Sequence, residues 1–167
     1  QRLMEERLLS RQRPAEVFKW YAVQRDLQKR VQDRVCKVIS PNGYQYAGDW
    51  ISGKKTGCGK INYKNGDIYK GQVLNGLRHG LGELHIASSG WKFKGIWTNE
   101  NISGAVEITT KDWTFKGKMT EIHAPMVGQM SYAAKSVYVG EFLNFQRQGQ
   151  GTLTKHSGEC IAGIWSD

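Results

Sequence analysis

A short phrase built on an aromatic residue and a glycine returns at a fixed interval along most of this chain. The first clear copy is Tyr46-Ala47-Gly48-Asp49-Trp50. The lead positions of the six copies are Tyr46, Tyr69, Phe93, Phe115, Tyr138 and Ile161, with steps of 23, 24, 22, 23 and 23 residues. A constant period of this size indicates a repeat array, in which each unit packs mainly on its neighbours.

Each copy is predicted to form a β-hairpin. In residues 46–50 the aromatic and glycine positions alternate, so they share one face of a strand, and residues 57–61 alternate in the same way. A polar turn that contains Gly53 lies between these two segments, and Asn65-Gly66 marks the turn to the next hairpin. Six first strands and five second strands, eleven in all, are expected.

The glycines that recur within the predicted strands require an explanation, because glycine weakens the interior of a strand unless another group must approach closely. We infer that each lead ring lies over glycines of its own hairpin or of the adjacent one. A side chain added at such a glycine would be driven into the ring. The glycines predicted to be structural in this sense are Gly48, Gly57, Gly59, Gly71, Gly80, Gly82, Gly140, Gly149 and Gly151.

Residues 43–167 resemble the MORN repeat (membrane occupation and recognition nexus). The second copy is the closest to the family pattern, with Tyr69-Lys70-Gly71, Asn75-Gly76 and the run from Arg78 to Gly82. The resemblance implies an all-β, single-layer antiparallel meander of about six 23-residue β-hairpins, curved into a groove. It also implies a place in cytoskeletal, ciliary or organellar assemblies.

Copies three, four and six depart from this pattern. Val106 stands at the second glycine of copy three, and Met126 stands at the first glycine of copy four. Residues 121–125 replace the turn of copy four, and copy six consists of a first strand only. The geometry is therefore expected to deviate in the middle of the sheet.

Residues 1–40 are predicted to form a basic α-helical arm with a break near Pro14, ahead of the repeat domain at 43–167. The second helix is expected from about Pro14 to Cys36. Its apolar docking stripe consists of Val17, Trp20, Tyr21, Leu27, Val31 and Val35. Three roles fit such a stripe: it covers the repeat sheet, docks on another subunit, or lies on a membrane surface.

The charge and the cysteines restrict the setting. The net charge is +9, and residues 1–40 hold ten Lys or Arg against five Asp or Glu. Three cysteines without CxxC spacing favour a reducing, intracellular location over secretion, and no apolar run is long enough to span a membrane. The first residue, Gln1, suggests a fragment or a processed form. Together with the basic pI, it favours an organelle such as the mitochondrion.

No catalytic or metal-binding constellation is expected. None of the four histidines has a His or Cys at ligand spacing, and the glycine pairs precede strands, whereas a phosphate loop precedes a helix. The sequence therefore predicts no enzyme activity, no cofactor and no small-molecule substrate.

Two classes of function remain. The first is a scaffold that binds other protein subunits through the groove and the N-terminal helix. The predicted groove residues are Tyr46, Trp50, Tyr69, Phe93, Trp97, Phe115, Tyr138 and Phe142, each with a purely structural role as the alternative. The second is binding to anionic phospholipid through basic residues, many of which strand alternation should place on the opposite face. They are Lys54, Lys55, Lys60, Lys64, Lys70, Arg78, Lys92, Lys94, Lys111, Lys116 and Lys118. Nucleic acid is disfavoured, because no recognisable binding module is present.

Overall fold

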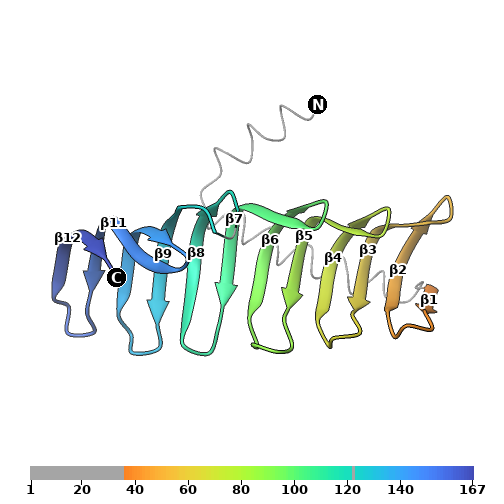
Figure 1. The fold of residues 1–167 in the computed structure, drawn as a ribbon, viewed down its shortest axis with the longest axis horizontal. Helices are drawn as coiled ribbons and strands as arrows, with labels where there is room; N and C mark the ends of the chain where they lie inside the picture. The colour runs from red at the N-terminus through yellow and green to blue at the C-terminus, as the bar shows by residue number, and fades with distance from the viewer. Residues whose placement is uncertain (1–35, 122) are drawn as a thin grey trace, which may run out of the picture.

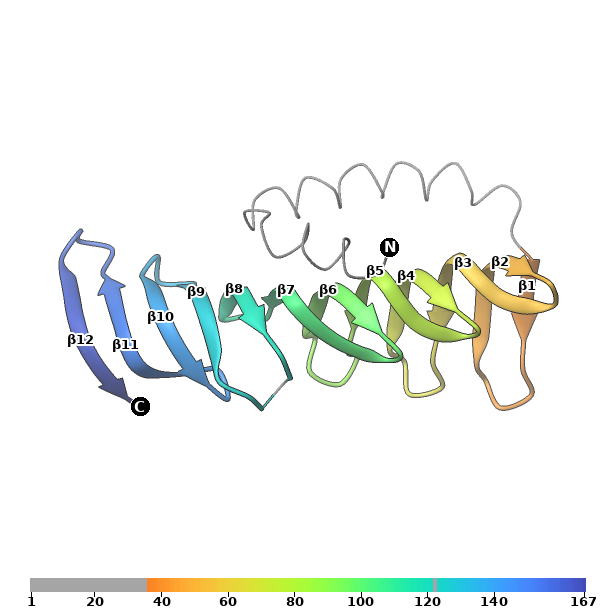
Figure 2. The same cartoon turned by 90° about the horizontal axis from the view of Figure 1, so that it is seen from above.

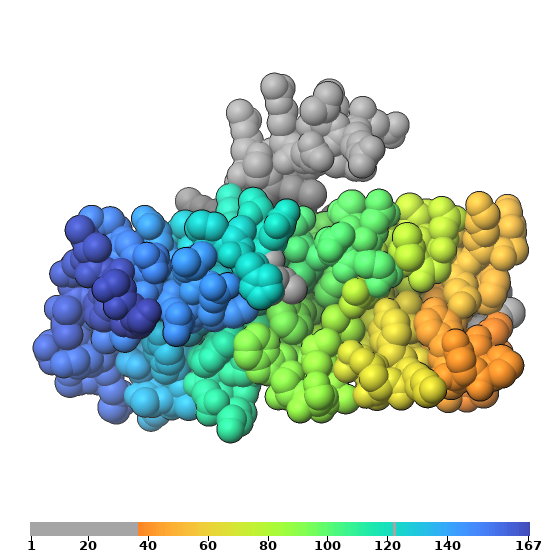
Figure 3. Space-filling model, in the orientation of Figure 1, coloured from red at the N-terminus to blue at the C-terminus, as the bar shows by residue number. Residues whose placement is uncertain are grey.

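A computed structural model of the chain describes residues 36–121 and 123–167, in which every regular element is a strand. Twelve strands form one antiparallel sheet in the order of the sequence. They are β1 (Cys36–Ile39), β2 (Gln45–Ile51), β3 (Lys54–Asn62), β4 (Ile68–Leu74), β5 (Leu77–His85), β6 (Lys92–Thr98), β7 (Asn101–Thr109), β8 (Trp113–Met119), β9 (Met126–Tyr132), β10 (Val137–Leu143), β11 (Gln146–Thr154) and β12 (Cys160–Ser166). The meander runs from one end of an elongated body to the other (Figures 1 and 3). This arrangement confirms the predicted antiparallel meander.

The first strand was not expected. Residues 36–39, assigned from the sequence to the end of the helical arm, form β1 and pair with β2. A turn after Ser40 joins the two strands, and the Gly43 N–H donates to the Ser40 carbonyl at 3.0 Å. Two β-branched residues, Val38 and Ile39, favour this extended conformation. The rest of the predicted arm, and so its docking stripe, lies outside the described residues.

The tight turns within the hairpins share one backbone conformation. At Asn75-Gly76 both central residues have positive φ, 53° and 87°, which is typical of a type I′ turn. The turns at 52–53, 99–100 and 144–145 are built in the same way. Copy four is the exception, because residues 120–125 connect β8 to β9. The expected deviation of this copy is therefore observed.

A row of glycines crosses the sheet at mid-strand. Cross-strand pairing places one residue of each strand in this row, and from β2 to β12 all but one of them are glycine. In strand order the row consists of Gly48, Gly59, Gly71, Gly82, Gly95, Val106, Gly117, Gly128, Gly140, Gly151 and Gly163. Cys36 of β1 continues it, since it pairs with Gly48.

Four lead rings lie over this glycine row, as the sequence predicts. A Cβ on Gly59 would come within 2.6 Å of the Tyr46 ring, and one on Gly117 would come equally close to Cζ of Phe115. Tyr69 and Tyr138 lie over their glycine pairs in the same way. Because no real Cβ approaches a ring so closely, these positions accept only glycine without a shift of the ring.

The first glycine of each pair has a different role, which corrects the expectation that both glycines underlie a ring. Gly57, Gly80 and Gly149 have φ of 118°, 57° and 61°, and each lies within the register shift of its hairpin. A Cβ on Gly80 would overlap the side chain of Gln72 and not a ring. Gln72 Oε1 lies there because it accepts a hydrogen bond from the Leu81 N–H at 2.9 Å. These glycines therefore serve β-bulges.

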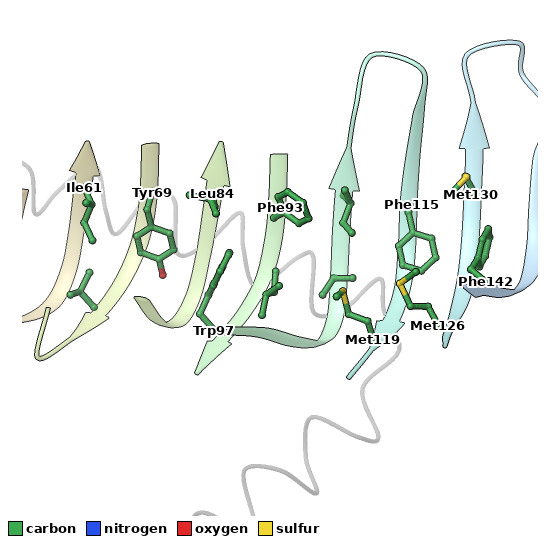
Figure 4. Close-up of a cluster of buried hydrophobic side chains, with 14 of the residues drawn as sticks. Ile61, Tyr69, Leu84, Phe93, Trp97, Phe115, Met119, Met126, Met130 and Phe142 are labelled. Carbon is green, nitrogen blue, oxygen red and sulfur yellow. The ribbon is translucent and has the colours of Figure 1, made fainter. Parts of the chain in front are cut away.

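Aromatic contacts join each hairpin to the next. The Tyr69 ring meets Trp97 edge to face, with centroids 5.6 Å apart and an interplanar angle of 84°. Phe115 and Phe142 repeat this contact at 5.2 Å, and the core runs through most of the array (Figure 4). The strands also curve along their length (Figure 2). Each copy is therefore stabilised by its neighbour.

Candidate functional site

Most of the predicted groove residues lie in the core. Tyr46, Tyr69, Phe115 and Tyr138 are fully buried, and the remaining groove residues except Trp50 are at most 9% exposed. Trp50 is 37% exposed and meets Tyr46 edge to face at 5.9 Å. The buried rings therefore hold the sheet together, and a partner that reaches this face meets the residues around them. The face that carries the lead rings is called the aromatic face below.

Copy three differs from the others at the place where the glycine row is interrupted. Val106 is fully buried there, and a Cβ on Gly95 would lie 2.7 Å from Cδ1 of Ile102. Ile102 thus covers the glycine that a lead ring covers elsewhere. Figure 4 shows the Phe93 ring close to the level of Leu84, whereas the Tyr69 and Phe115 rings reach further along their strands.

A pocket of about 540 Å³ lies against this displaced ring. We call it the copy-three pocket. Its apolar lining consists of Leu84, Ile86, Phe93, Trp97 and Ile102, and its polar lining consists of Arg78, Glu100, Asn101, Glu121 and His123. Apolar walls with a few polar groups are typical of sites that take a ligand side chain or a small molecule.

Arg78 and Glu100 form the polar edge of this pocket. The Glu100 carboxylate lies 2.7 Å from Nε of Arg78 and accepts a hydrogen bond from the Arg78 backbone N–H at 2.6 Å. The guanidinium also lies over the Trp97 ring, 4.6 Å from its centroid. Glu100 has φ of 74° at a turn position where the first two copies have glycine. This strained backbone is held by the contacts with Arg78.

A second aromatic group, which the sequence prediction missed, lies beside the core. Trp91 and Trp113 meet edge to face at 5.4 Å, and Phe145 stacks on Trp113 at 5.5 Å. Trp91 and Trp113 each stand two residues before a lead residue, so strand alternation could have placed them on the aromatic face. Nothing local marks Phe145, which lies in a hairpin turn with φ of 64°.

The opposite face carries a row of alternating charges. Lys70 pairs with Glu83, Glu83 with Lys94, Lys94 with Glu107, and Glu107 with Lys116. Lys116 Nζ lies 3.6 Å from the Glu107 carboxylate. Lysines therefore lie on this face, but carboxylates interrupt them. Two residues predicted for it lie on the aromatic face instead, since Lys55 approaches the Tyr46 ring and Arg78 lies over Trp97.

The hydroxyls of two core tyrosines donate to backbone carbonyls at the bulges. Burial, with a smaller contribution from Asp49, raises the pKa of Tyr46 from 10.0 to about 12. Its hydroxyl donates to the Asp49 carbonyl at 2.9 Å. The Tyr69 hydroxyl donates to the matching carbonyl, that of Gln72, at 2.8 Å. These hydroxyls satisfy carbonyls at the bulges and are not placed for proton transfer.

The described residues offer no metal centre. Within 36–121 and 123–167, no three His, Cys, Asp or Glu side chains lie close enough together to hold an ion. No helix in these ranges has the length and apolar character needed to cross a membrane.

The fold and the glycine row define a β-hairpin repeat protein. The family model for the MORN repeat matches residues 46–68, 69–90 and 138–160. The chain therefore contains three MORN repeats, in these three segments. The copy-three pocket is lined by the matched copy two and by copies three and four, which the family model does not match.

Two further comparisons describe relatives. Alsin of Rattus norvegicus, of Mus musculus and of Homo sapiens is 25% identical over 134 residues, which cover 73% of this chain and 8% of each relative. The chain thus spans about 8% of the length of these relatives.

Among solved structures, the TCP10c domain of Drosophila melanogaster Sas-4 matches with a TM-score of 0.39 at 16% identity, covering 80% of this chain and 94% of that one. The SAS-4 TCP domain in complex with a proline-rich motif of Ana2 matches with a TM-score of 0.33 at 15% identity, covering 78% and 90%. Both TM-scores are too low to bear on function.

Proposed function

We propose that this sheet is a non-catalytic protein-interaction module of a larger assembly, and that a segment of another subunit binds at the copy-three pocket. The observation that carries the proposal is the interruption of the glycine row at Val106. At this position no lead ring lies over the row as it does in other copies, and an apolar pocket with a charged edge results. A helix or an extended peptide with one large apolar side chain suits such a site.

The polar edge adds a preference for a basic partner segment. Arg78 is paired with Glu100, so that pair is close to neutral, whereas Glu121 is exposed beside it. A Lys or Arg next to the anchoring side chain would lie near this carboxylate. Such pairing contributes more to the association rate and the specificity than to the affinity.

Anionic phospholipid is the alternative partner, and the exposed Lys70 and Lys116 favour it. Glu83 and Glu107 lie in the same row and would repel lipid phosphates. Protein binding is therefore the better-supported function. Sedimentation with anionic vesicles at low salt distinguishes the two, since lipid binding through lysines weakens steeply as salt is added.

The test of the main proposal uses two matched substitutions. Cross-linking mass spectrometry in native extract identifies the neighbouring subunit, which is then purified and titrated against the variants. Ile86→Asp places a charge in the pocket, whereas Val139→Asp places it on the opposite face, where Val139 is 53% exposed. We expect at least tenfold weaker binding for Ile86→Asp and unchanged binding for Val139→Asp. Equal affinities for the two folded variants would show that the pocket is not the binding site.

A further inference from the structure

The arm that precedes β1 enters the sheet at a specific level. Cys36 pairs with Gly48, so the chain arrives in line with the glycine row and not at the end of a strand. The level of this row is also the level at which the lead rings cover the sheet. A segment leaving β1 toward the aromatic face would therefore run along the row, over the rings.

The length of the arm matches the distance to the copy-three pocket. A helix rises about 1.5 Å per residue, so the stretch from Trp20 to Cys36 spans about 24 Å. Strands lie about 4.8 Å apart, so the five steps from β1 to β6 also span about 24 Å. A helix that starts at β1 and follows the row thus brings Trp20 to the level of Phe93 and Trp97, which line the pocket.

The polarity and the charge of the arm also suit the copy-three pocket. The apolar stripe predicted for the arm needs an apolar surface, and the opposite face offers a row of lysines and glutamates instead. The pocket is walled by Leu84, Ile86 and Ile102, and Glu121 lies at its edge. Residues 1–40 carry ten Lys or Arg against five Asp or Glu, so their net charge is opposite to that of this carboxylate.

We propose that residues 17–35 of this chain dock on the aromatic face as an amphipathic helix, with Trp20 in the copy-three pocket. The inference rests on the proposed function, because the arm then occupies the site that a partner uses. A partner segment must displace the arm, which makes the arm an intramolecular inhibitor of binding. The affinity of the partner is reduced by the fraction of molecules in which the pocket is filled.

The experiment uses the full chain with a photoreactive benzoylphenylalanine in place of Trp20. The matched control carries the same group in place of Ala22, which lies about 200° further round a helix and so faces away from the sheet. Equal amounts of isotopically labelled and unlabelled chain are mixed, which separates links within one molecule from links between copies. Circular dichroism checks that each variant is folded.

We expect links within one molecule from position 20 to Ile86, Phe93 or Ile102, with at least fivefold lower yield from position 22. Ile86→Asp should reduce the yield at least fivefold, and Val139→Asp should leave it unchanged. Links to Val127 or Val139 on the opposite face, links only between copies, equal yields from positions 20 and 22, or no mapped link would overturn the proposal.

The failure of this inference differs from a failure of the proposed function. If position 20 gives no link to the pocket but Ile86→Asp still abolishes binding of the purified partner, the arm is not the occupant and the interaction site stands. If the link forms but Ile86→Asp leaves the affinity for the purified partner unchanged, the arm occupies the pocket and the partner binds elsewhere.

Discussion

Val106 pairs with Gly95 across β6 and β7, and in the described strands from β2 to β12 it is the one member of the glycine row with a side chain. Its isopropyl group takes the space over which a lead ring lies in the hairpins led by Tyr46, Tyr69 and Tyr138. The Phe93 ring lies elsewhere, and a pocket remains. Valine in place of glycine at this one position thus accounts for the different packing of copy three.

The glycine row should be intolerant of side chains only where a ring lies over it. A Cβ on Gly82 would overlap the hydroxyl and ring of Tyr69. We expect Gly82→Ala to lower the free energy of unfolding by about 1–3 kcal/mol, the usual cost of overpacking a core. Urea unfolding followed by tryptophan fluorescence measures this change.

Gly163→Ala is the matched control within the same row. A Cβ on Gly163 has no neighbour within 4 Å, so this change should alter stability by less than about 0.5 kcal/mol. Similar losses for both variants would mean that glycine is required for backbone flexibility and not for the space under the ring.

The Glu100 turn allows backbone strain to be separated from side-chain contacts. Glu100→Ala and Glu100→Gly both remove the carboxylate that binds Arg78, but only alanine keeps a side chain at φ of 74°. Both variants should be less stable than the parent, and Glu100→Ala should be the worse by about 1–2 kcal/mol. Thermal unfolding of the two variants gives the difference.

Glu159→Ala provides the comparison for the loss of an ion pair alone. Glu159 pairs with Lys155 at 3.0 Å with both side chains largely exposed, so its removal should cost less than about 0.5 kcal/mol. If Glu100→Ala and Glu100→Gly were equally stable, the turn would not be strained.

Stability should fall in alkaline solution because of the buried tyrosines. The pKa of Tyr46 is raised from 10.0 to about 12, so the folded state favours the protonated phenol. The stability that this shift contributes is fully present below pH 10.0 and is lost as the pH rises toward about 12. Urea unfolding across this range should show a steeper decline for the parent than for Tyr46→Phe, and parallel curves would argue against the shift.

The period and the hairpin order of the sheet could be predicted because they depend on contacts between neighbouring hairpins. Alternation placed the lead residues on one face, and the departure of Val106 from the pattern marked the copy in which the geometry was expected to deviate. These features are local, since each hairpin pairs only with the next one.

Other features depend on how the sheet bends, which no local pattern records. Phe145 meets Trp113 because a turn of copy five folds over the core, and this contact joins residues 32 positions apart in the sequence. The strand β1 lacks the lead phrase, so the period does not reveal it. The bulge role of Gly57 was hidden because both glycines of a pair look equivalent in sequence.

The most direct test of the account is a crystal structure of the Val106→Gly variant. Removing the side chain restores the glycine row, and the account predicts that the Phe93 ring moves over Gly95, displaces Ile102 and closes the copy-three pocket. If the Phe93 ring and the pocket stay as they are in the parent, Val106 is not the cause of the pocket, and the central claim is wrong.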